Sequence, residues 1–556
     1  THEGQSGDVQ PVERATYSDL KGQGGLAWSA SRGGTSYEAG ASLTGSSVQA
    51  EALRFGELGA RAPKVDLAEY AVGLTRGETA VRLGHVSYGN HPLLVSGMSS
   101  RGLLVSARPW ERLDVAFSAL NGTAIVGYDN LFGLDTWDHR VAGVTVGYEL
   151  LAERPGGLRV EFSLFDASIQ SQVDFNAGMV PDAERSRGLG LRLLAASPEG
   201  RVRAEVAWAR SRYVNPFDPL LAQGEALQPV AETRGEGRIV DLSFDLLRSA
   251  TTFSEQHPLD VTLTLHHDQV DPLYKSLGAF FATDQRVNRV GLAMSMGGAQ
   301  VQFGASSSVD NLRDVPTLLK TRTSDRSVNV ALPLPSWFGP GDGSPTWWPS
   351  LNYGWQWVHQ RAVNVPAIED SGFADSHRPD QKNTSHTLNL SWAFHPVTFS
   401  YGLSYAFQDN RQPGRERADF RNLGHQVSGS WQIGDGLNAT LGFGRTRSYS
   451  TEQALATYVN NVSLGGDWAI TPSWSVAANL NKTLNTNSED TSLSRNDGLQ
   501  AQLTYRFELP GAGRPLPGQA FVRYSQNSAR TRDDIFLFSS RQRAWFVDMG
   551  VSLSLF

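Results

Sequence analysis

The sequence predicts an all-β protein, built as a single large antiparallel transmembrane β-barrel of about 26 strands, with about 24 as the alternative. Three observations predict it. Segments of about ten residues alternate apolar and polar side chains along almost the whole chain. Short turns and long loops alternate between these segments, which gives the sheet two different ends. The pattern continues through a last strand, Trp545 to Phe556, that closes on an aromatic residue.

Composition excludes several classes of protein. The 556 residues contain no Ser/Pro tract, charge block or low-complexity run that would mark a linker. No apolar run approaches the roughly 18 residues of a membrane helix. The net charge of -7 argues against nucleic-acid binding, which needs a basic surplus. The absence of cysteine suits a chain that crosses an oxidising periplasm.

Period-two alternation is clearest in five segments. They are Leu158 to Leu164, Val202 to Trp208, Val240 to Leu246, Leu259 to Leu265 and Leu499 to Phe507. An extended chain places alternate residues on opposite faces, so each segment has an apolar face and a polar face. In a soluble sandwich, the alternative interpretation, the apolar face would cover a second sheet. In a membrane barrel it faces lipid and the polar face lines the lumen.

The connections favour the barrel. The short ones include Gly77-Glu78, Pro198-Glu199-Gly200, Gly297-Gly298, His395-Pro396, Gly434-Asp435-Gly436 and Thr471-Pro472-Ser473. The long ones are Asn90 to Ser100, Gly122 to Asp138, Gln170 to Arg187, Val214 to Arg234, Asp271 to Arg286, Asn311 to Thr323, Val363 to Thr384 and Asp409 to Asn422. A soluble sandwich has no reason to sort its loops by side, whereas a membrane barrel has short periplasmic turns and long outer loops.

One connection on the short side is long: Pro333 to Pro349, which is rich in Pro, Gly and Trp. We expect it to be an interfacial aromatic anchor, rather than a periplasmic contact or a plug.

The strand count depends on the start of the chain. From Val65 onward the pattern rules predict about 23 strands. Gly25 to Arg32, Ser36 to Thr44 and Ser47 to Phe55 can add about three more. We therefore expect a periplasmic N-terminal segment at residues 1–23 and the barrel at residues 24–556. No signal peptide is visible at the start, so we expect a mature form or a piece of a longer precursor.

From about Gly24 to Phe556 the chain resembles the Gram-negative outer-membrane β-barrels, and its expected width resembles the large members that export polysaccharide, insert lipopolysaccharide or secrete protein. The resemblance implies a bacterial outer-membrane location, with contacts to membrane lipid, lipopolysaccharide and the barrel insertion machinery. It also implies that Phe556 is the insertion signal. One feature departs from the family. The apolar row Val547 to Leu555 lies on the opposite face of the strand from Phe556, which shares its face with Ser554.

No residue pattern indicates enzyme chemistry. His266 and His267 are adjacent on a strand, so their rings face opposite ways and cannot share a metal. His386, His395 and His425 lie on neighbouring segments but define no site. We therefore expect no catalytic, cofactor-binding or metal site, no cofactor and no enzymatic activity.

Three outer loops carry apolar runs that a fully solvated loop would not contain. These runs are Ala124 to Leu134, Leu277 to Phe281 and Ile535 to Phe538. They are expected to form a gate or plug, a docking surface for a partner, or extensions of the adjacent strands. The candidate gate or plug residues are Tyr128, Leu131, Phe132, Phe280, Phe281, Phe536 and Phe538.

A fourth loop is basic. Arg411, Arg415, Arg417 and Arg421 are candidates for binding lipopolysaccharide or an acidic polymer, and a solvated loop is the alternative.

A barrel of this width needs something in its lumen, since wall side chains alone cannot fill it. Folded-in loops, an upstream domain, a cargo or a partner protein would serve. The width predicts an outer-membrane translocation or secretion barrel, a gated conduit for a polysaccharide or a protein. The alternative is a non-transporting anchor or assembly partner of a cell-surface complex. Either function implies a periplasmic or cell-surface protein partner or a translocated polymer.

Overall fold

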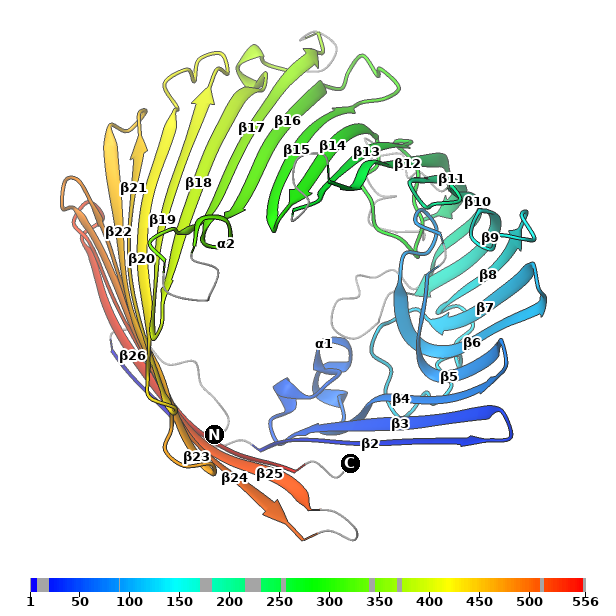
Figure 1. Ribbon diagram of the computed structural model, residues 1–556, viewed down its shortest axis with the longest axis horizontal. Helices are drawn as coiled ribbons and strands as arrows, with labels where there is room; N and C mark the ends of the chain where they lie inside the picture. Colours follow the sequence, from blue (N-terminus) through cyan, green and yellow to red (C-terminus); the bar gives the residue numbers. More distant parts are fainter. Residues whose placement is uncertain are drawn as a thin grey trace.

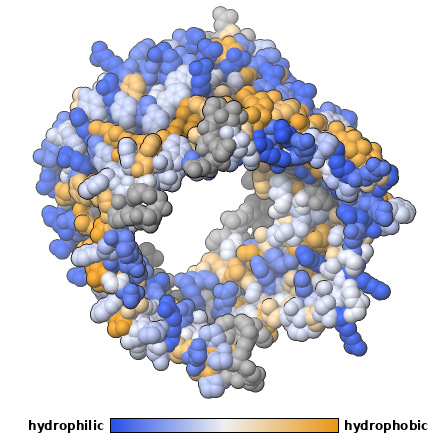
Figure 2. Space-filling model, viewed as in Figure 1, coloured by the Kyte–Doolittle hydropathy of each residue, from blue (hydrophilic) through white to orange (hydrophobic). Residues whose placement is uncertain are grey.

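A computed structural model describes residues 2–7, 20–89, 91–170, 183–215, 232–251, 257–339, 346–367, 373–510 and 515–553. These residues form one antiparallel sheet of 26 strands. The sheet curls into a ring (Figure 1), and the space-filling view shows an opening through its middle (Figure 2). Among the described residues, no helix is long and apolar enough to span a bilayer.

The strands are β1 (His2–Gly7), β2 (Lys21–Arg32), β3 (Thr35–Ser46), β4 (Val65–Arg76), β5 (Thr79–Tyr88), β6 (Met98–Trp110), β7 (Leu113–Asn121), β8 (Arg140–Glu149), β9 (Leu158–Gln170), β10 (Ala183–Ala196), β11 (Val202–Val214), β12 (Glu232–Ala250), β13 (Leu259–Val270), β14 (Gln285–Met296), β15 (Ala299–Asp310), β16 (Lys320–Pro333), β17 (Ser350–Asn364), β18 (Asp380–Phe394), β19 (Val397–Asn410), β20 (Phe420–Ile433), β21 (Leu437–Ser450), β22 (Leu455–Ala469), β23 (Trp474–Asn487), β24 (Ser492–Leu509), β25 (Leu516–Asp533) and β26 (Phe538–Leu553). The short helices are η1 (Gln49–Glu51), α1 (Phe55–Leu58), η2 (Gly59–Arg61), α2 (Leu334–Phe338) and η4 (Asp375–His377).

The strands follow one another around the sheet in chain order. From β2 to β26 each strand pairs antiparallel with the next, and β1 pairs with β26. In the described part of the chain, β1 has no pairing with β2. The predicted all-β antiparallel architecture is confirmed.

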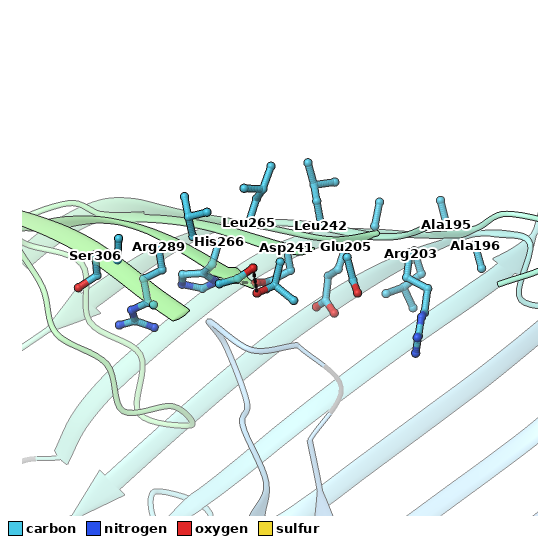
Figure 3. Close-up of a pocket in the computed structure, with 18 of the residues that line it drawn as sticks. Ala195, Ala196, Arg203, Glu205, Asp241, Leu242, Leu265, His266, Arg289 and Ser306 are labelled. Carbon is cyan, nitrogen blue, oxygen red and sulfur yellow. Dashed lines mark hydrogen bonds and ion pairs between the residues drawn. The ribbon is translucent and has the colours of Figure 1, made fainter. Parts of the chain in front are cut away.

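The predicted alternation sorts the side chains between two faces. Leu191 pairs with Phe162, and both are exposed although they are large and apolar. In Figure 3, Leu242 and Leu265 lie on one side of the sheet, whereas Asp241 and other charged side chains lie on the other. The connection between β5 and β6 lies inside the ring (Figure 1) and packs on this second side, as described below, so the charged side is the inner face. The apolar rows therefore face outward.

The two ends of the sheet differ as predicted. One end carries turns such as residues 77–78 and 297–298, and the other carries connections such as residues 47–64, 122–139 and 271–284. On the long side, the last three connections are the exceptions, because they shrink to residues 451–454, 488–491 and 534–537.

The long connection on the short-turn side has aromatic contacts. Its helix α2 brings Trp337 to the neighbouring turn, where the indole N–H donates a 2.9 Å hydrogen bond to the Gly297 carbonyl. The Phe338 and Trp348 rings lie 5.0 Å apart, and the Trp347 side chain is exposed. An exposed aromatic cluster at a strand end is the arrangement expected of an interfacial anchor.

The first strands differ from the expectation in two ways. The predicted strand Ser47 to Phe55 is wrong: this segment forms η1 and leads into α1. Its N–H groups close local turns, from Glu51 to the Val48 carbonyl and from Phe55 to the Ala52 carbonyl, so they are not available to a neighbouring strand. The segment 1–23, expected to lie outside the barrel, contains β1 and the start of β2.

Candidate functional site

The best-formed site is a loop packed on the inner wall. The connection between β5 and β6, described at residues 89 and 91–97, is called here the inner loop. Its side chains Leu93 and Leu94 are only 1% and 0% exposed. Such burial is unusual for a connection at the long-loop end of the sheet, where most connections are polar. They belong to a buried apolar cluster with Phe165 of β9 and Ala209 of β11. Apolar burial of this extent holds the inner loop against the wall.

A second connection covers the inner loop. Residues 271–284, between β13 and β14, are called here the clamp loop. The Tyr274 hydroxyl donates a 2.8 Å hydrogen bond to the Leu93 carbonyl, and the Ser276 hydroxyl donates one of 2.8 Å to the Leu94 carbonyl. The Ser96 N–H donates to the Gly278 carbonyl at 3.0 Å. The clamp loop thus satisfies backbone groups that the buried inner loop withdraws from water.

The clamp loop is itself tied to the wall. The Lys275 ammonium donates to the Tyr213 hydroxyl at 2.7 Å and lies 3.3 Å from the Glu184 carboxylate. Tyr274 is 1% exposed, and its burial raises its pKa well above the ordinary value for tyrosine. At neutral pH its hydroxyl is therefore protonated and can donate to Leu93.

Wall glycines make room for the inner loop. A Cβ atom at Gly188 would lie 2.5 Å from Leu94 Cδ2, and one at Gly190 would lie 2.7 Å from the His91 ring. Separations this short are not tolerated between carbon atoms. The surface that receives the loop is therefore smooth because these inward positions carry no side chain.

His91 links the inner loop to the wall through a pair of hydrogen bonds that only its neutral ring can make. Its Nδ1 accepts from the Leu93 N–H at 3.3 Å, and its Nε2 lies 3.4 Å from the Leu191 carbonyl. These partners require a neutral ring with the proton on Nε2. Burial lowers the pKa of His91, and the nearby Arg192 guanidinium lowers it further. The docked loop thus favours neutral His91.

A third connection is anchored by a buried arginine. Arg101 of β6 is fully buried, and its guanidinium donates to the carbonyls of Gly127 and Asn130 in the β7–β8 connection. It also donates to the Leu67 carbonyl of β4 at 3.2 Å. Nearby, the Asn121 amide donates to the Gly133 carbonyl at 2.7 Å. The two terminal nitrogens of the guanidinium thus donate to three carbonyls of two separate segments.

Arg101 lies where the hydrogen-bonded pairing between β4 and β5 ends, a gap in the wall that is called here the fork. β4 pairs with β5 only from Ala71 to Arg76, so the remainder of β4 has a neighbour on one side only, namely β3. The Arg54 guanidinium holds Asp66 of this free stretch at 2.6 Å and Asp129 of the β7–β8 connection at 3.0 Å. Burial beside this cluster raises the pKa of Glu57. Connections from the long-loop end therefore close the fork.

Below the loops the inner wall carries paired charges. Arg159 contacts Asp114 at 2.6 Å, Glu161 at 2.7 Å and Glu149 at 3.2 Å. Arg192 continues the network to Glu161 at 3.2 Å. A chain of alternating charges thus runs across the inner faces of β7 to β10, and neighbouring partners neutralise one another.

The network borders a groove of about 840 Å³. Its side chains Arg203, Glu205, Asp241 and His266 point to one side in Figure 3. His266 lies 2.5 Å from Asp241 and 3.1 Å from Asp268, so it is held between two carboxylates. As the alternation predicts, His267 points elsewhere and contacts Asn288 at 2.8 Å.

The candidate gate or plug residues lie in different surroundings. Phe281 packs on Tyr274 with ring centroids 5.0 Å apart and joins the buried cluster. The others are exposed: Tyr128, Leu131, Phe132, Phe280, Phe536 and Phe538. The run at 535–538 occupies a short turn and the first residue of β26, as expected if this run extends a strand. A role in gating stays a prediction for all seven residues.

The four candidate anion-binding arginines have separate contacts. Arg411 pairs with Asp409 at 2.8 Å, and Arg415 pairs with Glu452 at 3.3 Å. Arg421 lies over the Phe407 ring, and Arg417 is exposed. Anion binding by this loop remains a prediction. Phe556, the expected insertion signal, lies outside the described residues.

Sequence reasoning missed the inner loop. Asn90 to Ser100 counted as a long polar connection, yet it contains Pro92-Leu93-Leu94-Val95, an apolar run as marked as those in the candidate gate loops. This apolar run could have indicated that the connection packs inside the ring. The flanking glycines, Gly89 and Gly97, carry no charge that would keep it in solvent.

No protein-family model matches the chain, and no curated protein matches its sequence. Solved structures do match. The translocation pore of the P pilus usher PapC is 10% identical, covering 96% of this chain and 98% of PapC at a TM-score of 0.31. The FrpB iron transporter from Neisseria meningitidis is 10% identical, covering 86% and 93% at 0.32. OmpT, an outer membrane protein of Vibrio cholerae, is 10% identical, covering 65% and 100% at 0.25. The chain is thus similar to outer-membrane proteins, as its predicted resemblance implies.

Proposed function

We propose that this chain forms a closed barrel in the bacterial outer membrane and acts as a gated conduit for a large polymer. The inner loop and the clamp loop form the gate. The observation that carries the proposal is the burial of Leu93 and Leu94 on the inner wall of a ring that surrounds an opening. A loop packed inside such a ring narrows it without filling it.

Membrane insertion is supported by the outward rows. Large apolar side chains such as Leu164, Leu441 and Leu464 are exposed on strands whose other face is polar. Exposure of such an apolar band to water is unfavourable, whereas contact of the band with lipid is favourable.

The gate occupies only part of the wall. The buried apolar cluster and the side chains packed on it run from Val86 to Phe281, which corresponds to β5 and the strands and connections up to the clamp loop. Release of the inner loop would therefore widen an existing passage. A permanently filled anchor, the alternative function, would gain nothing from a loop held by a neutral histidine and a few hydrogen bonds.

Deletion of the inner loop tests the proposal. Tyr88 and Met98 are paired directly across β5 and β6, so removing residues 90–96 leaves Gly89 and Gly97 as a two-residue hairpin. The control removes an equal number of residues, 412–418, from the β19–β20 connection. Single-channel conductance in planar bilayers is expected to rise for the first variant and to stay at the wild-type value for the control.

Two outcomes would overturn the conduit. A barrel that remains electrically silent after removal of both the inner loop and the clamp loop is a filled anchor. A chain that refolds and stays soluble without detergent does not carry a lipid-facing band.

A further inference from the structure

One stretch of the inner wall is free of ionisable groups. Ser306 of β15 lies on the charged inner side in Figure 3 and pairs with Asp325, which pairs with Val358 of β17. Cross-strand partners share a face. Following the register from Val358, every inward position of β17 to β21, all of them described, is Ser, Thr, Asn, Gln, Gly, Ala, Val or Phe. This surface is called here the neutral wall.

One row shows its character. Across the strands the inward partners run from Asn329 of β16 through Gly354, Thr387, Ser404, Gly424 and Thr446. Hydroxyl groups also pair directly on this wall, as Ser400 with Ser428 at 2.5 Å and Thr398 with Ser430 at 2.6 Å. Each hydroxyl can both donate and accept, and each amide offers two donors and an acceptor.

The charges of these five strands lie on the other face. Lys382 pairs with His359 and Asp409, whereas its neighbours Gln381 and Asn383 face inward. Arg445 likewise alternates with the inward Gly444 and Thr446. These five strands therefore contain charged residues, but only on their outer face.

The opposite part of the wall has the contrary character. There Arg159, Arg192 and their carboxylate partners form the ion-pair network beneath the inner loop. The inner loop and the clamp loop are therefore held over the charged side of the wall.

We propose that the neutral wall binds an uncharged polyhydroxylated chain, a neutral glycan, as it passes through the barrel. This inference rests on the proposed conduit and names its cargo. Sugar hydroxyls donate and accept in all directions, as do the Ser, Thr, Asn and Gln side chains of the wall. Many weak hydrogen bonds suit transport, because a chain must bind well enough to enter and weakly enough to leave.

Other polymers fit the wall less well. An anionic polysaccharide would need guanidinium or ammonium groups to replace its lost hydration, and the neutral wall has none. An unfolded protein carries charges of both signs and large apolar side chains, which the neutral wall leaves without partners.

The test records current blocks in the inner-loop deletion variant of the full chain. The probes are maltoheptaose, an oligogalacturonate of the same length and a neutral Gly/Ser peptide of similar extended length. The test variant adds Asn389→Leu, Gln408→Met and Gln426→Met to the neutral wall. The control adds Asn527→Leu, Gln519→Met and Gln542→Met to the inner faces of β25 and β26, which carry the Arg523–Asp548 ion pair.

Maltoheptaose is expected to block longest, and the neutral-wall substitutions are expected to shorten its blocks about tenfold, since they remove hydrogen bonds of modest net worth. The control is expected to leave the blocks unchanged. If oligogalacturonate or the peptide blocks as long as maltoheptaose, or if both variants lose blocking alike, the glycan inference is overturned while the conduit stands.

A silent channel would count against the conduit alone. In that case, calorimetric titration of maltoheptaose into the detergent-solubilised full chain decides the glycan inference. Binding that is lost in the test variant and kept in the control supports it, and absence of binding in the unmodified chain overturns it.

Discussion

The Tyr274 hydroxyl donates a 2.8 Å hydrogen bond to the Leu93 carbonyl. The two residues lie 181 positions apart in the sequence, and their bond joins the clamp loop to the inner loop. Both groups are buried, so neither has water as an alternative partner. The bond therefore belongs to the docked state of the inner loop and is lost when the loop leaves the wall.

Tyr274→Phe is expected to destabilise the docked loop. The ring stays against Phe281, but the buried Leu93 carbonyl loses its donor, at a cost of about 1–3 kcal/mol. Spontaneous openings in single-channel recordings should become about tenfold more frequent or more. Tyr148→Phe, at an exposed tyrosine of β8, is the control and should match the wild type. Unchanged opening in Tyr274→Phe would contradict the assignment of the clamp loop.

Gly190→Ala is expected to displace the inner loop by contact alone. The new Cβ would lie 2.7 Å from the His91 ring and 2.9 Å from Leu94 Cδ1, so these buried side chains must shift, which weakens the hold of the inner loop on the wall. Gly444→Ala is the matched control on the inner face of β21, where the atom nearest to a Cβ, the His425 carbonyl oxygen, lies at an ordinary 3.8 Å. Conductance should rise in the first variant only. Equal behaviour of the two would show that the loop is not held by this surface.

Acid is expected to open the gate through His91. Its pKa in the docked state lies below the ordinary 6.5, so below about pH 6.5 the released loop takes up a proton that the docked loop does not. Docking of the inner loop therefore becomes less favourable as the pH falls. Protonation of Nδ1 would also remove the acceptor for the Leu93 N–H. Arg192 and Glu161 are the charged groups that act on this ring.

Open probability recorded between about pH 7.5 and about pH 5 measures the effect. His91→Asn should flatten the profile, because asparagine keeps polar atoms but does not titrate. Burial also lowers the pKa of His139, in the β7–β8 connection, so His139→Asn serves as the comparison. A profile that follows His139 instead of His91 would place the sensor in the other connection.

Arg101→Met is expected to loosen the β7–β8 connection. The change leaves the carbonyls of Leu67 and Asn130 without their guanidinium partner. Each unpaired buried carbonyl costs about 1–3 kcal/mol. Chymotrypsin should cut faster at Tyr128 and Phe132, as judged by mass spectrometry of the folded protein in detergent. Arg108→Met, at an exposed arginine of the same strand, is the control. Equal cleavage rates would show that Arg101 does not anchor the connection.

Much of the fold follows from local sequence. Alternation in Leu158 to Leu164 indicates both the strand β9 and its apolar face, since a period of two has one structural meaning. Turn residues such as Gly297-Gly298 mark the short end. The prediction is wrong at Ser47 to Phe55, where the alternation rests on small residues and buried Arg54 binds Asp66.

The chain by itself determined that there is a sheet, which side of each strand is apolar and which end has short turns, because these depend on spacing within a few residues. Tertiary structure decided which loop enters the ring, because Leu93 is held by Tyr274 and by a wall whose glycines, Gly188 and Gly190, lie almost a hundred residues away in the chain. It also decided that the inward residues of β17 to β21 form one continuous uncharged surface, because only the register sets Thr387 beside Ser404. Contacts between distant segments leave no periodic trace in the sequence.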